Sequence, residues 1–117
     1  MELEEHLFSA LGDLVDIYPD GGVPEIEPPL PYATYVRAGG RVVTTVAKES
    51  IPDLQHAHVQ INVWTSTILG ASRLIREIDI AIRQTNQFEG KPLSSPANIA
   101  SDDDSFGLTQ DFSIWFK

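Results

Sequence analysis

Residues 56 to 65 alternate strictly between apolar and other side chains, and this stretch constrains the fold more than any other part of the sequence. The apolar positions are Ala57, Val59, Ile61 and Val63. The positions between them are His56, His58, Gln60, Asn62 and Trp64. Successive side chains of a β-strand point to opposite faces, so the pattern predicts a strand with one face in a core. The other face is either solvated or, given its one large aromatic ring, half covered by a neighbouring element or subunit.

Two segments have the apolar spacing of an amphipathic helix. The first runs from Glu2 to about Val15, and its stripe consists of Leu3, Leu7, Leu11 and Leu14. The second begins after Ser66 or Thr67, either of which can cap it, and ends near Asn86 and Gly90. Its apolar face consists of Ala71, Leu74, Ile75, Ile78 and Ile82.

The remaining segments indicate further strands and their connections. The five prolines from Pro19 to Pro31 predict an extended connector. The less common alternative is a proline-rich segment that binds an aromatic groove of a partner protein. The runs 32–37 and 41–46 are rich in β-branched or aromatic residues and flank Gly39-Gly40, which predicts a β-hairpin. The small and polar residues and the two prolines of residues 91–107 predict a long connection with a short strand near Ile99. In the terminal strand the buried face is predicted to be Phe112, Ile114 and Phe116.

The order of these elements predicts an α+β fold, with an antiparallel β-sheet packed on one side by two amphipathic helices in the order α-β-β-β-α-β. A length of 117 residues fits one domain spanning 1–117. Cysteine is absent, which excludes disulfides, thiolate metal sites and thiol catalysis. The sequence begins with acidic residues and has no apolar run long enough to cross a bilayer, so we expect a soluble protein that stays inside the cell.

The charge balance and the polar motifs argue against most chemistry. Eight basic against 17 acidic residues give a net charge of −9, which disfavours binding to nucleic acid and anionic lipid. His56 and His58 share a strand face and could hold a metal, but His6 is expected on the polar side of the first helix. The Asp102-Asp103-Asp104 run lacks the spacing of a calcium loop. Without a nucleophile elbow or a phosphate-binding loop, we expect no enzyme, no cofactor and no metal.

The sequence points instead to contacts with other proteins. Tyr35, Trp64 and Trp115 fall on predicted strands, opposite or beside the apolar faces. Large aromatic side chains are enriched in the buried centres of protein interfaces, so these three are candidate contact residues. The acidic run Asp102, Asp103 and Asp104 is a further candidate. The alternative, equally open from the sequence, is that the aromatic residues pack within one chain under the helices or the connector.

Several of these stretches resemble the tail completion family of long-tailed bacteriophages. The similar parts are Pro31-Tyr-Ala-Thr-Tyr-Val-Arg, then His58-Val-Gln-Ile-Asn-Val-Trp64 with the Thr/Ser turn and helix after it, and Asp111-Phe-Ser-Ile-Trp. The opening helix and its proline-bearing connector are also similar, so the resemblance covers most of the chain. The segment from Gly39 to Gln55 and the acidic loop have no counterpart.

The resemblance implies a structural virion protein, a tail terminator that caps the head-proximal end of the tail tube, ends its polymerisation and offers a surface for head joining. It implies a ring, commonly hexameric, that contacts the tail tube protein and the head connector proteins while DNA passes through it. It also implies assembly in the host cytoplasm, or in the bacterial cytoplasm for a prophage, and a place in the virion tail. Two alternatives remain: another head-tail connector or tail-tube component, and a small ligand-binding domain or enzyme.

Overall fold

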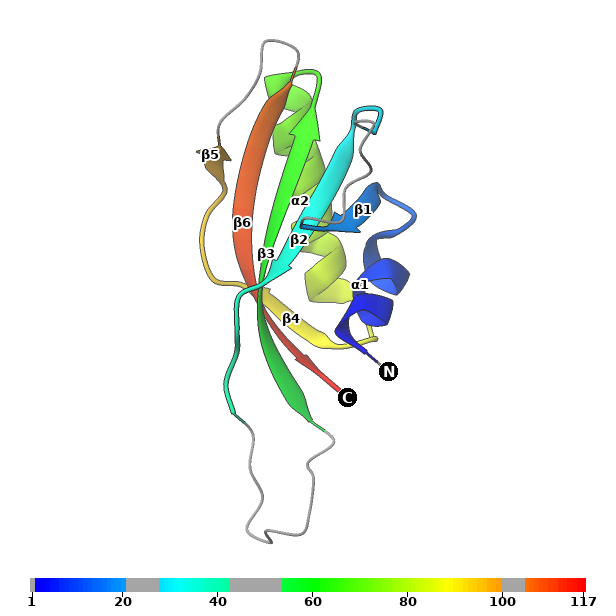
Figure 1. The fold of residues 1–117 in the computed structure, drawn as a ribbon, viewed down its shortest axis with the longest axis vertical. Helices are drawn as coiled ribbons and strands as arrows, with labels where there is room; N and C mark the ends of the chain where they lie inside the picture. Colours follow the sequence, from blue (N-terminus) through cyan, green and yellow to red (C-terminus); the bar gives the residue numbers. More distant parts are fainter. Residues whose placement is uncertain (1, 21–27, 43–53, 100–104) are drawn as a thin grey trace, which may run out of the picture.

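A single twisted β-sheet has both helices packed against one of its faces (Figure 1). The structure, a computed structural model, describes residues 2–20, 28–42, 54–99 and 105–117. Its elements in chain order are α1 (Leu3–Leu11), β1 (Asp16–Pro19), β2 (Tyr32–Arg37), β3 (Gln55–Thr65), α2 (Ile68–Gln84), β4 (Glu89–Pro92), β5 (Ala97–Ile99) and β6 (Phe106–Phe116). The predicted α+β class is confirmed, and so is the order of two helices separated by three strands.

The sheet has the strand order β1-β2-β3-β6-β4, and β5 pairs with β6 beside β4. Each pair is antiparallel except β1 with β2, which is parallel, so the sheet is mixed where the sequence predicted an antiparallel one. A parallel pair needs a crossover of about a dozen residues or more. The proline-bearing connector, residues 20–31, has that length.

The two long central strands confirm the alternation seen in the sequence. In β3 the four apolar residues predicted to face the core are fully buried. In β6 the three predicted core residues are at most 2% exposed. The two strands pair along their whole length, from Gln55 opposite Phe116 to Thr65 opposite Phe106. Apolar rows from both strands therefore form one continuous wall beneath the helices.

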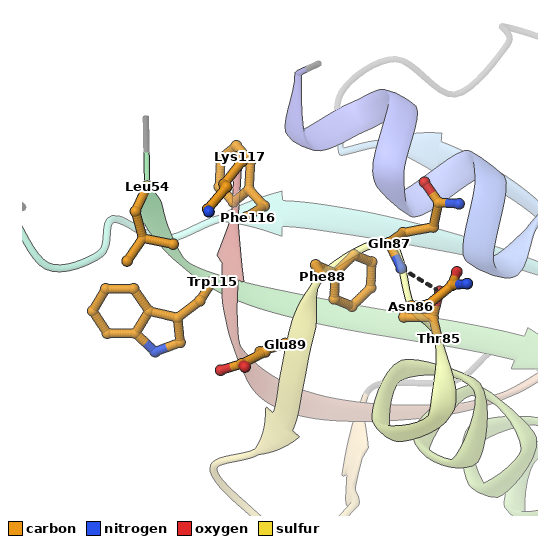
Figure 2. Close-up of a pocket in the computed structure, with 9 residues that line it drawn as sticks. All are labelled: Leu54, Thr85, Asn86, Gln87, Phe88, Glu89, Trp115, Phe116 and Lys117. Atoms are coloured by element: carbon orange, nitrogen blue, oxygen red, sulfur yellow. Dashed lines mark hydrogen bonds between the residues drawn. The ribbon is translucent and has the colours of Figure 1, made fainter. Parts of the chain in front are cut away.

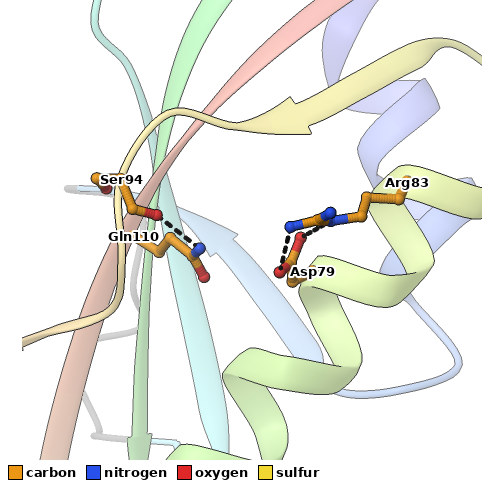
Figure 3. Close-up of polar contacts among 4 residues, drawn as sticks. All are labelled: Asp79, Arg83, Ser94 and Gln110. Carbon is orange, nitrogen blue, oxygen red and sulfur yellow. Dashed lines mark hydrogen bonds and ion pairs between the residues drawn. The ribbon is translucent and has the colours of Figure 1, made fainter.

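Helix α2 follows its predicted pattern, because its five buried residues are the five that the sequence placed on one face. The side chain of Thr67 caps it, with Oγ1 accepting the backbone N–H of Gly70 at 3.0 Å. On its exposed side Arg83 forms an ion pair with Asp79, one turn earlier, at 2.7 Å (Figure 3). No helix in the described part of the chain has the length and hydropathy of a membrane span.

Helix α1 is shorter than predicted, and a strand follows it. The helix ends at Leu11, and residues 12–14 form a turn that leaves Leu14 39% exposed. Strand β1 then buries Ile17 beside Ala33 of β2. The helix prediction failed here because Leu14 continued the leucine spacing, whereas Gly12 with its low helix propensity ends the helix.

The predicted hairpin between residues 32–37 and 41–46 is wrong. Strand β2 pairs with β3 along one edge, and β1 occupies the other edge from Tyr32 to Tyr35. After β2 the chain continues along β3, where the backbone N–H of His58 donates to Gly39 O at 2.8 Å. Gly39 has a φ of 98°, which favours glycine. Residues 43–46 of the predicted strand lie outside the described residues.

Between α2 and β6 the structure contains two short edge strands. The predicted strand near Ile99 is confirmed as β5, whereas β4 was not predicted. The segment between them is fastened to β6 by Gln110, whose Nε2 donates to Ser94 O at 2.8 Å (Figure 3). Strand β4 was missed because its four residues are too few to show a period. Its composition, with Gly90 and Lys91, also suggested a loop.

Candidate functional site

In the described part of the chain, one face of the sheet has no helix over it. We call it the helix-free face. It is formed by the outward side chains of the three central strands, which are Tyr32, Thr34, Val36, His56, His58, Gln60, Asn62, Trp64, Thr109, Asp111, Ser113 and Trp115. Three of its polar side chains, Thr34, Asn62 and Ser113, are buried, and Asn62 Nδ2 donates to Thr34 Oγ1 at 3.3 Å. The face therefore has buried polar side chains along its strands and a tryptophan side chain towards each end.

Of the three aromatic residues proposed as contact residues, the structure places two on this face. Trp64 and Trp115 lie on it and are half-buried. Tyr35 points the other way, is 5% exposed and meets the ring of Phe8 from α1 edge-on at 6.2 Å. Burial, and then the nearby carboxylate of Glu4, raise the pKa of Tyr35 above its ordinary value. The assignment of Tyr35 to a contact surface is therefore wrong, because α1 covers that side of β2.

The two tryptophans belong to separate clusters. Trp64 pairs with Gly107 and Trp115 pairs with His56, eight positions apart along β3. At about 3.3 Å per residue, this separates the two indoles by roughly 26 Å along the strands. A partner that contacts both must therefore span most of the sheet.

The Trp64 cluster is a row of rings that crosses three strands. The indole of Trp64 stacks on Tyr32 with 5.3 Å between centroids, and Tyr32 meets Tyr18 edge-on at 6.4 Å. Next to Trp64 the row reaches Gly107, where a Cβ would lie 3.1 Å from the indole Nε1 and 2.5 Å from Ile99 Cγ1. The absence of a side chain at Gly107 thus allows Trp64 and Ile99 to approach one another across β6.

The Trp115 cluster borders an open groove at the end of the sheet where β6 terminates (Figure 2). The Trp115 ring packs against His56 with 4.4 Å between centroids. The groove has a volume of about 640 Å³ and is lined by Leu54, Thr85, Asn86, Gln87, Phe88, Glu89, Trp115, Phe116 and Lys117. Its walls are mainly apolar, so it suits a hydrophobic side chain better than a reacting polar group. The candidate acidic residues Asp102, Asp103 and Asp104 lie outside the described residues.

One pair on the helix-free face has the spacing of a catalytic serine and histidine. His56 Nε2 lies 2.7 Å from Ser113 Oγ. However, the other ring nitrogen, Nδ1, accepts the backbone N–H of Arg41 at 2.9 Å, so the proton of the neutral ring is on Nε2. Nε2 then donates to Ser113 and cannot accept its hydroxyl proton. In this arrangement His56 is a positioning group and not a general base.

The surroundings of His56 make the stability of the folded protein depend on pH. Burial, followed by the positive charges of Arg41, His58 and Lys91, lowers the pKa of His56 below 6.5. Between the lowered folded-state pKa and 6.5, the unfolded chain binds a proton that the folded chain does not, so stability decreases as pH falls through this range. Above pH 6.5 the His56 ring is neutral in both the folded and the unfolded chain, so it no longer makes the stability depend on pH.

We therefore expect His56→Gln to remove part of the loss of stability that the wild-type protein shows on acidification. The measurement is urea unfolding of both proteins at pH 7.5 and at pH 5.5. An equal loss of unfolding free energy in the wild type and the variant would show that His56 does not contribute to the pH dependence.

The histidines do not converge on a metal. His58 Nε2 lies 3.5 Å from Asp111 Oδ2, but the described residues contain no group of three His, Cys, Asp or Glu side chains placed to hold an ion. His6 is 6% exposed and packs edge-on against Phe88 and Phe116, so its predicted position on the polar side of the helix is wrong. It follows Leu3 by three positions, which places it on the apolar face of α1.

The sequence did not reveal the basic residues near His56. Arg41 and Lys91 line a hollow with His56, His58 and Ser113. Strand pairing places His58 and Lys91 on either side of Ser113, and the chain after β2 brings Arg41 to His56. Comparison of the sequence with protein-family models gave no match, and comparison with curated proteins gave none either.

Proposed function

We propose that this chain is a structural assembly protein, the tail completion protein of a long-tailed phage. In this role it caps the head-proximal end of the tail tube, ends tube polymerisation and provides the surface for head joining. Its partners are further copies of itself in a ring, the tail tube protein and the head connector proteins. Assembly takes place in the host cytoplasm and the product is part of the virion tail.

The observation that carries this proposal is the position of the three stretches that resemble the family. Residues 31–37, 58–64 and 111–115 are far apart in the sequence, yet they form β2, β3 and β6, which are neighbours in the sheet. Tyr32 lies opposite Trp64, and His58 lies opposite Ser113. These three stretches thus form one contiguous part of the sheet, as expected when similarity reflects a shared fold.

The distribution of aromatic side chains supports a contact function. The core beneath the helices accounts for most apolar residues of the strands, but Trp64 and Trp115 are half-buried on the helix-free face. A protomer in a closed ring contacts a neighbour on each of two sides. Two clusters roughly 26 Å apart suit two such contacts better than one.

The charge of the chain is compatible with a passage for DNA. Its net charge is −9. A wall with many basic groups would bind phosphates and retard the moving duplex, whereas acidic walls would repel it. The repulsion would come from the net charge of the ring as a whole and not from particular residues.

The test is to delete the gene from the phage genome and image the particles by electron microscopy. We expect abnormally long tails or tails without heads, and normal particles when the gene is supplied from a plasmid. Normal particles from the deletion phage would overturn the proposal. Purified protein mixed with isolated tail tubes should bind at one end of each tube, and binding along the sides would also contradict it.

A further inference from the structure

A hollow on the helix-free face, distinct from the Trp115 groove, gathers basic and hydrogen-bonding groups. We call it the Ser113 pocket. It has a volume of about 370 Å³ and is lined by Ala38, Gly40, Arg41, His56, His58, Lys91, Leu93, Ser113 and Trp115. None of these described lining residues has a carboxylate. The pocket therefore contrasts with a chain in which acidic residues outnumber basic ones by 17 to eight.

Strand pairing places Ser113 at the centre of this group. His58 of β3 lies opposite Ser113 on one side, and Lys91 of β4 lies opposite it on the other. The chain after β2 supplies a third basic residue, Arg41. Gly40 passes so close to β3 that a Cβ there would come within 2.2 Å of His56 O. This approach lets the next residue, Arg41, donate its backbone N–H to His56.

The hydrogen bonds leave donors available inside the pocket. Since His56 Nε2 donates to Ser113 Oγ, the hydroxyl of Ser113 still has a hydrogen to donate, and no residue in the described part of the chain accepts it. Ser113 itself is only 4% exposed, so its hydroxyl is held in a fixed environment. Among the described residues, Arg41 and Lys91 form no ion pair. A hydroxyl, an ammonium and a guanidinium thus line the same hollow.

The nearest acidic side chains lie beside the pocket and do not line it. Asp111 lies next to the pocket but contacts His58 at 3.5 Å. Glu89 precedes Lys91 by two positions and lines the Trp115 groove, together with a smaller hollow that it shares with Lys91, but it does not line the Ser113 pocket. Arginine and lysine form strong charge-assisted hydrogen bonds with groups that carry several acceptor oxygens.

We propose that the Ser113 pocket binds an oxyanion, a carboxylate or phosphate group held by Arg41, Lys91 and the hydroxyl of Ser113. Its position on the helix-free face makes a carboxylate side chain of another protein one source of this group and free phosphate the other. The proposal rests on the pocket alone and is independent of the role in phage tails.

The test follows the amide and side-chain NMR signals of the labelled protein during titration with acetate and, separately, with inorganic phosphate at constant ionic strength. We expect saturable shifts at Lys91, Ser113 and the indole of Trp115 with at least one probe. Tighter binding of acetate indicates a protein carboxylate as the natural ligand, and tighter binding of phosphate indicates the free anion. The absence of saturable shifts with both probes in the millimolar range would overturn the proposal.

Two arginine variants with the same change of charge separate a specific site from general attraction. Arg41→Gln removes the guanidinium but keeps the backbone N–H that binds His56, and we expect it to weaken binding about tenfold. Arg76→Gln changes an exposed arginine of α2 and should leave affinity unchanged. Ser113→Ala tests the hydroxyl and should weaken binding severalfold. Equal affinity in Arg41→Gln and Arg76→Gln would refute the site, provided that thermal unfolding shows both variants to be folded.

Discussion

Phe112→Ala is expected to lower the free energy of unfolding by about 3–5 kcal/mol, the usual cost of truncating a fully buried aromatic residue. Phe112 has no exposed surface and is among the largest fully buried side chains. It lies on β6 between Val59 of β3 and Pro92 of β4. Removing the ring would leave a cavity where the central strands meet the helices, and a small domain has only about 5–15 kcal/mol of stability in total.

Urea unfolding followed by tryptophan fluorescence and by circular dichroism measures this loss. Phe8→Ala is the matched control, because it makes the same chemical change at a side chain that is 44% exposed. Its main loss is the edge-on contact with Tyr35, a contact worth about 1 kcal/mol. If the two variants were equally destabilised, the assignment of the core to the helix side of the sheet would be wrong. Should Phe112→Ala not fold, Phe112→Leu gives a smaller loss of the same sign.

Trp64→Ala is expected to weaken self-association by about 30-fold or more, the effect of losing an interface hot spot of about 2 kcal/mol. This prediction rests on the proposed role in a ring. Trp64 is half-buried, and its fixed stack on Tyr32 presents a rigid aromatic surface on the helix-free face. A side chain that is already ordered loses little conformational entropy when a partner covers it.

Light scattering or sedimentation over a range of concentrations, with tail tubes present and absent, measures the association. Ile80→Ala is the control, since Ile80 is a large apolar residue, 45% exposed, on α2 and off the helix-free face. Loss of the Trp64 stack should cost the monomer about 0.5–1.5 kcal/mol beyond the area that the half-buried indole covers, so circular dichroism and thermal unfolding first establish that the variant is folded. Wild-type association of Trp64→Ala, or an equal loss in Ile80→Ala, would remove the Trp64 cluster from the contact surface.

The site could be predicted only in part. Alternation placed Trp64 and Trp115 on the faces opposite the core, and the structure agrees with both positions. The same reasoning could not decide which side of β2 would be covered, and so it assigned Tyr35 to a contact surface although α1 covers it. Leucine spacing likewise placed His6 on the polar side of α1, although its ring is packed between Phe88 and Phe116.

The sequence by itself determined those features that depend on neighbours a few residues away. Helical spacing determined the buried face of α2, and alternation determined the buried faces of β3 and β6, because both patterns follow directly from backbone geometry. For the same reason the cap of α2 could be narrowed to Ser66 or Thr67, and the structure shows that it is Thr67.

Only the tertiary structure decided which edges pair. Strand β1 occupies the edge of β2 that a hairpin would have used, because the connector is long enough for a parallel crossover and Ile17 gains burial beside Ala33. Strand pairing, together with the path of the chain after β2, also brought Arg41, His56, Lys91 and Ser113 around one pocket. Their sequence positions carry no sign of this, since the register between distant strands is set by the burial of whole faces and not by any local pattern.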